Sequence, residues 1–252
     1  MHRVKSLKSV IDEADHLYAC EHKHAKALTK INEALRHDPD CVAALVLRGR
    51  ILFQLNRLRE MQQSYDKALR IDPMCSEVFL ERAKVSSAIR QDYRTALREV
   101  EKALRYAGRS RWTRARALWL KGNILADLER DQEALRCYRK GLKLNPKDYD
   151  MHFALGNALA GMKHPAKALP HLRKALTLLQ SEQSPNPSIL ELFLETYAEV
   201  LNALGRHRSA LRILTGGKKR GRERKGGKNG VQKWGQATFL KIFEGRKKGR
   251  ES

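Results

Sequence analysis

The sequence predicts an all-α protein built from repeated pairs of helices. Two observations predict it: a dipeptide recurs with a period near 34 residues, and apolar residues within each period keep helical spacing. Asp38-Pro39 recurs 34 residues later as Asp72-Pro73, and a further 73 residues later, two periods plus five, as Asn145-Pro146. A helical hairpin cannot bury its apolar face alone, so a repeat of this length indicates stacked hairpins.

Two series of mostly small residues follow the same period. The first lies five residues before each proline and continues through repeats that lack the proline: Ala34, Ala68, Ala103, Gly141 and Ala175. The second has intervals of 34, 35, 38, 34 and 42 residues: Ala27, Met61, Ala96, Ala134, Ala168 and Ala210. The longer intervals predict insertions of one, four and eight residues between repeats or in turns.

Residues 42–75 show what one repeat contains. The apolar stripe of its first helix consists of Leu45, Leu52 and Leu55. After a turn at Asn56-Arg57, the stripe of its second helix consists of Leu58, Met61, Tyr65, Ala68 and Leu69. The proline that follows cannot continue a helix, so it ends the repeat.

One position in the first helix is reserved for small residues. It is occupied by Gly49, Gly122, Gly156, Ala83 and Ala198. Because a missing or small side chain lets another helix come close, we expect the partner helix to approach the first helix here.

This pattern of a small residue, Tyr or Leu, Ala, an aromatic residue, Ala and Pro resembles the tetratricopeptide repeat. Matching units are expected at about 8–41, 42–75, 76–110, 115–148, 149–182 and, in part, 191–215. The resemblance covers about four-fifths of the chain and implies a right-handed superhelical α-solenoid of about six helix-turn-helix repeats over residues 1–215. Asp15 and Met61 depart from the pattern, which indicates an edge repeat and a more loosely packed repeat, respectively.

In the family that the sequence resembles, the first helices line a concave groove. The resemblance implies a peptide groove formed by Arg50, Phe53, Leu80, Lys84, Trp119, Leu120, Asn123, Phe153 and Asn157, with Glu81, Glu195, Glu199 and Asn202 at further groove positions. Trp119, Leu80 and Phe153 would anchor apolar side chains, and the asparagines would hydrogen-bond an extended backbone. The alternative is that Trp119 and Phe153 only extend the core between repeats.

One subclass of the family binds the acidic C-termini of heat-shock chaperones through a clamp of two Lys, two Asn and one Arg. Counted from the fourth repeat, Asn123 fits the clamp, but Trp119, Ala154, Leu192 and Thr196 occupy its other positions. We therefore expect that the protein is not a receptor for chaperone tails.

Charge is the strongest compositional feature, with a formal net charge of +23. Residues 216–252, a Gly/Lys/Arg-rich tail, hold 13 Lys and Arg against 3 Glu, and the segment 105–116 holds five arginines beside Tyr106 and Trp112. Both segments favour contact with polyanions. The candidate polyanion-binding residues are Arg109, Arg111, Arg114, Lys218, Lys219, Arg220, Arg222, Arg224 and Lys225.

Both basic segments also have alternative interpretations. The segment 105–116 is interpreted as a solvated loop whose Trp112 caps the next helix. The tail is expected to be flexible, and either disordered or partly folded back over the last repeat. Its alternative interpretations are a nuclear localisation signal, a nucleic-acid or membrane contact, a solubilising extension, and the product of an altered reading frame or a truncation.

No motif of an enzyme or cofactor site is present. There is no Gly-rich phosphate loop and no nucleophile motif, and the nearest approach to a metal site is the group His16, Cys20, His22 and His24. We interpret that group as a polar turn because no second pair of ligands matches it. No cofactor and no metal are therefore expected.

The cysteines and the N-terminus bear on the compartment. Cys20, Cys41, Cys75 and Cys137 stand too far apart for a disulfide framework or a zinc site and are expected to be small buried side chains. Neither a signal peptide nor a membrane-spanning run is evident. The expected location is the cytoplasm, or the nucleus if the cell is eukaryotic.

The sequence thus predicts a non-catalytic protein-interaction scaffold or adaptor that binds a peptide or helix segment in its groove. The alternative is a nucleic-acid-associated factor that uses the tail and the segment 105–116. A third interpretation is the regulatory part of a larger enzyme assembly. Groove side chains vary over one scaffold, so the fold does not identify the partner.

Overall fold

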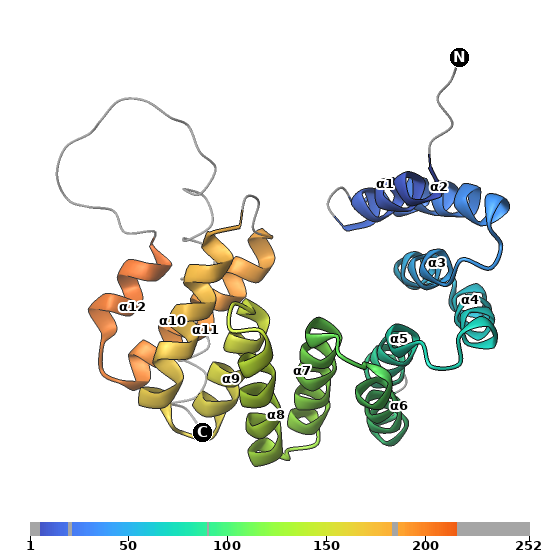
Figure 1. The fold of residues 1–252 in the computed structure, drawn as a ribbon. Coiled ribbons are helices and arrows are strands. Elements are labelled where there is room, and N and C mark those ends of the chain that lie inside the picture. The colour runs from blue at the N-terminus through green and yellow to red at the C-terminus, as the bar shows by residue number, and fades with distance from the viewer. Residues whose placement is uncertain (1–5, 20–21, 90, 183–185, 216–252) are drawn as a thin grey trace, which may run out of the picture. The chain divides into compact units, whose positions relative to one another are not determined.

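The computed structural model describes residues 6–19, 22–89, 91–182 and 186–215 (Figure 1). Over these residues the chain forms twelve helices and no strand, which confirms the predicted all-α repeat fold. They are α1 (Leu7–Ala19), α2 (His24–His37), α3 (Val42–Gln54), α4 (Leu58–Ile71), α5 (Ser76–Ala88), α6 (Tyr93–Tyr106), α7 (Arg111–Asp127), α8 (Asp131–Leu144), α9 (Tyr149–Gly161), α10 (Pro165–Gln180), α11 (Pro187–Ala203) and α12 (His207–Leu214). The predicted tail at 216–252 lies outside the described residues.

The chain divides into two compact units within α7, the first comprising Met1–Ile124 and the second Leu125–Ser252. In the first unit, α1 pairs with α2, α3 with α4, and α5 with α6, and α2 also contacts α3. In the second unit, α9 pairs with α10 and α11 with α12, while α8 packs on α9 and α10 on α11. Within each unit, helices therefore pack against their hairpin partners, and helices of neighbouring hairpins contact one another.

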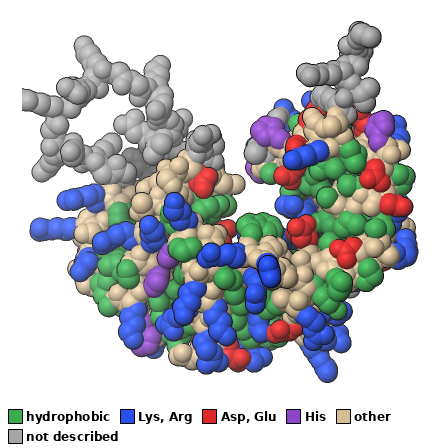
Figure 2. Space-filling model, viewed as in Figure 1, with side chains coloured by type: hydrophobic (Ala, Val, Ile, Leu, Met, Phe, Trp, Pro, Cys, Tyr) green, Lys and Arg blue, Asp and Glu red, His purple; other side chains and the backbone are tan. Residues whose placement is uncertain are grey.

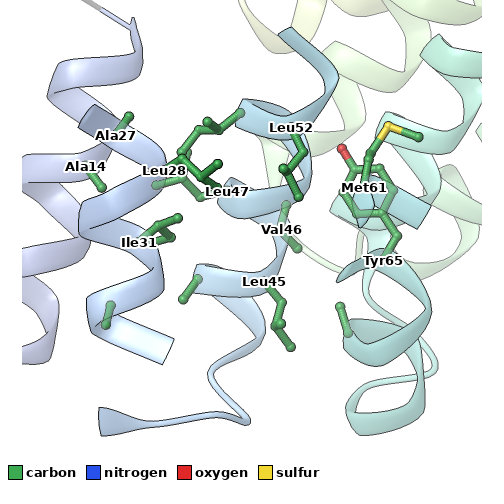
Figure 3. Packing of buried hydrophobic residues seen from close by; sticks show 14 of the residues in the cluster. Ala14, Ala27, Leu28, Ile31, Leu45, Val46, Leu47, Leu52, Met61 and Tyr65 are labelled. Carbon is green, nitrogen blue, oxygen red and sulfur yellow. The ribbon is translucent and has the colours of Figure 1, made fainter. Parts of the chain in front are cut away.

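The two helices of a hairpin are buried to different extents. In α3, seven residues are buried, and its side chains lie between those of α2 and those of α4 (Figure 3). In α4, only the stripe of Met61, Ser64, Tyr65 and Ala68 is buried. The first helix of a hairpin is therefore apolar on several sides, whereas the second is amphipathic and keeps a polar outer face.

The predicted small-residue position is a point of close helix contact. A Cβ atom on Gly49 would lie 2.1 Å from the Tyr65 ring, and one on Gly156 would lie 2.7 Å from the Leu172 side chain. Tyr65 and Leu172 both come from the partner helix of the same hairpin. The expectation that the partner helix approaches closely here is confirmed.

The turn inside each hairpin has one residue in the left-handed backbone region. These residues are His22, Asn56, Gln91, Glu129, Lys163 and Gly205, with φ between 49° and 73°. Each lies five residues before a member of the second series of small residues. The next backbone N–H donates to a carbonyl five or six residues back, as from Arg57 to Leu52 (2.9 Å) and from Arg206 to Leu201 (2.8 Å), which caps the first helix.

The recurrent Asp-Pro and Asn-Pro pairs also have a structural cause. The side-chain oxygens of Asp38, Asp72 and Asn145 accept the backbone N–H two residues on, at 3.1, 3.0 and 3.4 Å. This turn directs the chain from the second helix of one hairpin into the first helix of the next.

The interpretation of residues 105–116 as a solvated loop is wrong for most of the segment. α6 ends at Tyr106 and α7 begins at Arg111, so Trp112 lies in the first turn of α7. α7 has 17 residues, whereas α3, α5 and α9 have 13 each. The four inserted residues therefore lengthen the helix, because they add about one more turn to it.

Candidate functional site

The first helices of the first unit form a small pocket. It has a volume of about 150 Å³ and is lined from α3 by Val46 and Arg50, from α5 by Glu77, Leu80, Glu81 and Lys84, and from α7 by Trp112, Arg116 and Leu120. On α3 and α7 successive lining residues are four apart, and on α5 they follow the pattern i, i+3, i+4, i+7, so those of each helix share one face. Five predicted groove residues come together here: Arg50, Leu80, Glu81, Lys84 and Leu120.

The apolar residues of the pocket form its base and its wall. Leu80 and Leu120 are 5% and 6% exposed and belong to the core cluster that joins α5, α6 and α7. Trp112 is 60% exposed. The two leucines therefore form the base, and Trp112 offers an aromatic surface that the protein itself leaves in contact with solvent.

Ion pairs hold the charged side chains of this pocket in place. One carboxylate oxygen of Glu81 lies 2.7 Å from Lys84 Nζ and 3.8 Å from Arg50 Nε. The Arg50 guanidinium also lies 5.3 Å from the centre of the Tyr18 ring. Burial alone would lower the pKa of Arg50, but Glu81, Tyr18 and Asp15 together outweigh it and the pKa is raised. The pocket thus carries fixed charges beside its apolar base.

Trp119, predicted as a groove anchor, and Arg116, predicted only as part of the arginine-rich segment, lie differently from those predictions. Trp119 does not line the pocket; it is half-buried and packs against the core cluster of α5, α6 and α7. Arg116 lines the pocket, and its guanidinium lies 4.8 Å from the centre of the Trp119 ring. Part of the arginine-rich segment therefore lines the pocket.

Sequence reasoning did not select Trp112 as a groove residue. The signal was its spacing, because Trp112, Arg116 and Leu120 are separated by four residues each and share one helical face. The family positions start the fourth repeat at residue 115, and so Trp112 was assigned to the connecting segment.

The remaining predicted groove residues lie elsewhere. In the first unit, Phe53 is half-buried against the core of α1 to α4, and Asn123 is half-buried on α7. In the second unit, Asn157 is exposed on α9, and Phe153 stacks on Phe193 of α11 with ring centres 3.9 Å apart and planes 2° apart. Phe153 therefore joins consecutive first helices.

The candidate polyanion-binding residues are described in part. Arg109 lies in the turn between α6 and α7, and Arg111 and Arg114 lie on the first turns of α7; all three are exposed. The other candidates, Lys218, Lys219, Arg220, Arg222, Arg224 and Lys225, lie outside the described residues.

A second cavity, of about 210 Å³, lies between α4, α5 and α6, and sequence reasoning did not identify it. It is lined by Met61, Gln62, Tyr65, Arg82, Val85, Ser86, Thr95 and Glu99. The Nε atom of Arg82 and one carboxylate oxygen of Glu99 are buried there without a hydrogen-bond partner in the structure. Both cavities are smaller than the roughly 300–1,000 Å³ that is usual for small-molecule sites.

Other features of the described residues bear on chemistry and location. No group of three or more His, Cys, Asp or Glu side chains is arranged to hold a metal ion there, and Cys20 of the histidine-rich turn is not described. No described helix has the length and apolar character needed to cross a bilayer. Cys41, Cys75 and Cys137 form no disulfide, and burial raises the pKa of the Cys75 thiol.

Comparison with known proteins identifies the family. A model described as tetratricopeptide repeat matches residues 54–215, and a second of the same description matches residues 12–74. The chain is 26% identical over 145 residues to the DnaJ homolog subfamily C member 7 homolog of Schizosaccharomyces pombe. That match covers 51% of this chain and 29% of the relative, so the chain spans less than a third of the relative's length.

Solved structures share the fold at low identity. PilW, a type IV pilus biogenesis factor, superposes with a TM-score of 0.67 at 18% identity, over 84% of this chain and 92% of that chain. YrrB, described as a TPR protein with an unusual peptide-binding site, superposes with a TM-score of 0.50 at 20% identity, over 73% of this chain and 88% of that chain. The first family match alone covers more than half of the sequence and crosses both units. The chain therefore belongs to the tetratricopeptide-repeat family.

Proposed function

We propose that the protein is a non-catalytic interaction scaffold whose first unit binds an extended segment of a partner protein. Tetratricopeptide-repeat proteins generally mediate contacts between proteins. The observation that carries the proposal is the pocket of α3, α5 and α7, where the exposed Trp112 stands beside a buried leucine base and fixed charges. Exposed Trp and Arg at a preformed pocket are the residue types that dominate binding energy at protein interfaces.

The pocket also indicates the chemistry of the bound segment. Its volume suits one apolar side chain, which would contact Leu80, Leu120 and Trp112. Lys84 and Arg50 already neutralise Glu81, whereas Arg116 forms no ion pair within the described residues and has its guanidinium over the Trp119 ring. A partner segment with an apolar residue next to an acidic one would satisfy both features.

Two matched variants of the full chain test the proposal. Selection from a displayed peptide library should enrich apolar-acidic pairs, and Trp112→Ala should weaken binding of the enriched peptides by about tenfold or more, as for an interface anchor. Met74→Ala is the control, because Met74 is 62% exposed in the same unit and lies outside the pocket. Equal affinities for the wild type and the Trp112→Ala variant would refute the groove.

The expected location of this scaffold, the cytoplasm or a eukaryotic nucleus, stays a prediction. The nucleic-acid alternative based on the tail and residues 105–116 gains no support from Arg116, which lines the pocket. Phe153 and Asn157 stay predicted partner contacts of the second unit.

A further inference from the structure

Charge in the second unit is divided between its helices. α9 and α11 contain no Lys or Arg. α8 and α10 together contain seven: Arg136, Arg139, Lys140, Lys143, Lys167, Arg173 and Lys174. α10 contains no acidic residue, and the two acidic residues of α8 lie in its first turn. Figure 2 shows Lys and Arg side chains gathered over the second unit, with few acidic side chains among them.

These cations lie on the outer faces of their helices. α8 buries Ala134, Leu135, Cys137, Tyr138 and Gly141, and α10 buries Ala168, Leu169, Leu172, Ala175, Leu176 and Leu179. The seven basic residues are all exposed. On α8 they follow the pattern i, i+3, i+4, i+7, which places them on one face, with residues three or four apart about 5–6 Å from one another.

Most of these cations have no acidic partner. Arg136, Arg139, Lys140, Lys167 and Lys174 form no ion pair within the described residues. The outer helices of the first unit also carry arginines without an ion pair among the described residues, but acidic side chains stand among them: Asp66 of α4 pairs with Arg82 of α5, and Glu99 of α6 pairs with Lys102. A surface with so many like charges and so few counter-charges repels itself, and an anionic partner would relieve that repulsion.

Two histidines show that the rows on α8 and α10 act on the same region. His152 and His171 lie with their Nδ1 atoms 3.4 Å apart. Burial lowers the pKa of both rings; His152 and Arg139 of α8 lower that of His171 further, and Lys174 of α10 lowers that of His152 further. The Pro146 carbonyl and Asp148 oppose the shift at His152. Cations of both helices thus create a positive potential at these two histidines.

We propose that the outer face of α8 and α10 binds the phosphodiester backbone of a nucleic-acid strand. Rows of cations along two helices match an extended polyanion, and the three arginines can each bind a phosphate with two hydrogen bonds. The face has no exposed large apolar side chain on α8 or α10 that would enter a membrane. It also has no exposed aromatic residue for stacking on bases, so the binding is independent of sequence. This proposal does not depend on the groove of the first unit.

Titration of the full chain with a fluorescein-labelled oligouridylate at several salt concentrations tests the proposal. The variant Arg136→Gln/Arg139→Gln/Lys140→Gln should bind more weakly by about tenfold or more. The slope of log affinity against log salt should fall in magnitude by about two, since each lost phosphate contact removes roughly 0.7–0.9. The three residues are exposed, so the variant should keep the helical circular dichroism and the unfolding temperature of the wild type.

The matched control is Arg59→Gln/Arg70→Gln/Arg94→Gln, which removes three exposed arginines from the outer helices of the first unit. It removes the same net charge and leaves the basic tail in place, so it should keep the wild-type slope. Equal slopes for the two triple variants would overturn the proposal. So would a loss confined to phosphatidylserine vesicles or to polyglutamate, since either result would assign the face to a membrane or to an acidic protein.

Discussion

Gly156 and Gly161 lie on the same helix but differ in their surroundings. A Cβ atom on Gly156 would meet the Leu172 side chain at 2.7 Å and the Leu172 backbone nitrogen at 3.2 Å, whereas one on Gly161 would meet nothing within 4 Å. The backbone atom cannot rotate away as a side chain can. Replacement of Gly156 must therefore push α9 and α10 apart, and replacement of Gly161 need not.

We expect Gly156→Ala to lower the free energy of unfolding by about 1–3 kcal/mol, the usual cost of overpacking. Gly161→Ala should raise it by up to about 1 kcal/mol, because Ala loses less backbone entropy in a helix than Gly. Urea unfolding followed by circular dichroism measures both. Similar effects of the two substitutions would show that the hairpin has room at position 156.

The His152–His171 pair has a defined proton arrangement. The Nε2 atom of His152 lies 3.1 Å from the Pro146 carbonyl oxygen, which can only accept a hydrogen bond. His152 therefore carries its proton on Nε2 when neutral, and its Nδ1 accepts from Nδ1–H of His171 at 3.4 Å. Protonation of both rings would place two charges in contact.

The pair should make stability depend on pH. The pKa values of both rings are lowered in the folded state, so the unfolded chain binds more protons just below the ordinary His pKa of about 6.5. The contribution of the two histidines to the free energy of unfolding is complete above that pH and is lost as the pH falls toward their folded-state pKa values. His171→Gln should reduce the difference in unfolding temperature between pH 7.5 and pH 5, and His37→Gln at an exposed histidine should not.

Each hairpin turn needs a residue with positive φ, although only one repeat has glycine there. Gly205 has φ 73°, and a Cβ atom added to it would meet nothing within 4 Å. Lys163 occupies the same turn position in the preceding repeat with φ 60°. The cost of an L side chain at this position is therefore a matter of the backbone alone.

Gly205→Ala should lower the free energy of unfolding by about 1 kcal/mol, and Lys163→Gly should raise it by up to about 1 kcal/mol. Thermal unfolding of the two variants measures both changes in stability. Changes of the same sign would contradict the assignment of both residues to one left-handed turn.

The elements were largely predictable from the sequence, and their ends were not. The small position of Gly49 and Gly156 and the recurrent Asp-Pro turns follow from side-chain size and turn chemistry, which a periodic sequence displays directly. The hairpin turns carry His, Asn, Gln, Glu, Lys or Gly at the left-handed position, so no residue type marks them. The start of α7 was missed because an insertion of about one turn keeps the same helical face and leaves no break in the pattern.

At the scale of the whole molecule, the candidate site was predictable in outline only. Arg50, Leu80, Lys84 and Leu120 come together because the repeat places equivalent faces of successive first helices side by side. Trp119 and Trp112 could not be told apart by repeat position, since the lengthened helix moves the exposed aromatic residue one turn before the expected start of the repeat. The division of charge in the second unit appears only when each helix is considered separately.

The central claim is that a partner segment binds at the pocket of the first unit, against Trp112. The most direct test is a heteronuclear spectrum of the ¹⁵N-labelled full chain, in which the indole N–H signals of Trp112, Trp119 and Trp234 are resolved and assigned with single Trp→Phe variants. On titration with a peptide selected on the full chain, the account predicts a saturable shift of the Trp112 signal larger than that of Trp234. Binding that saturates while the Trp112 signal stays in place would contradict it.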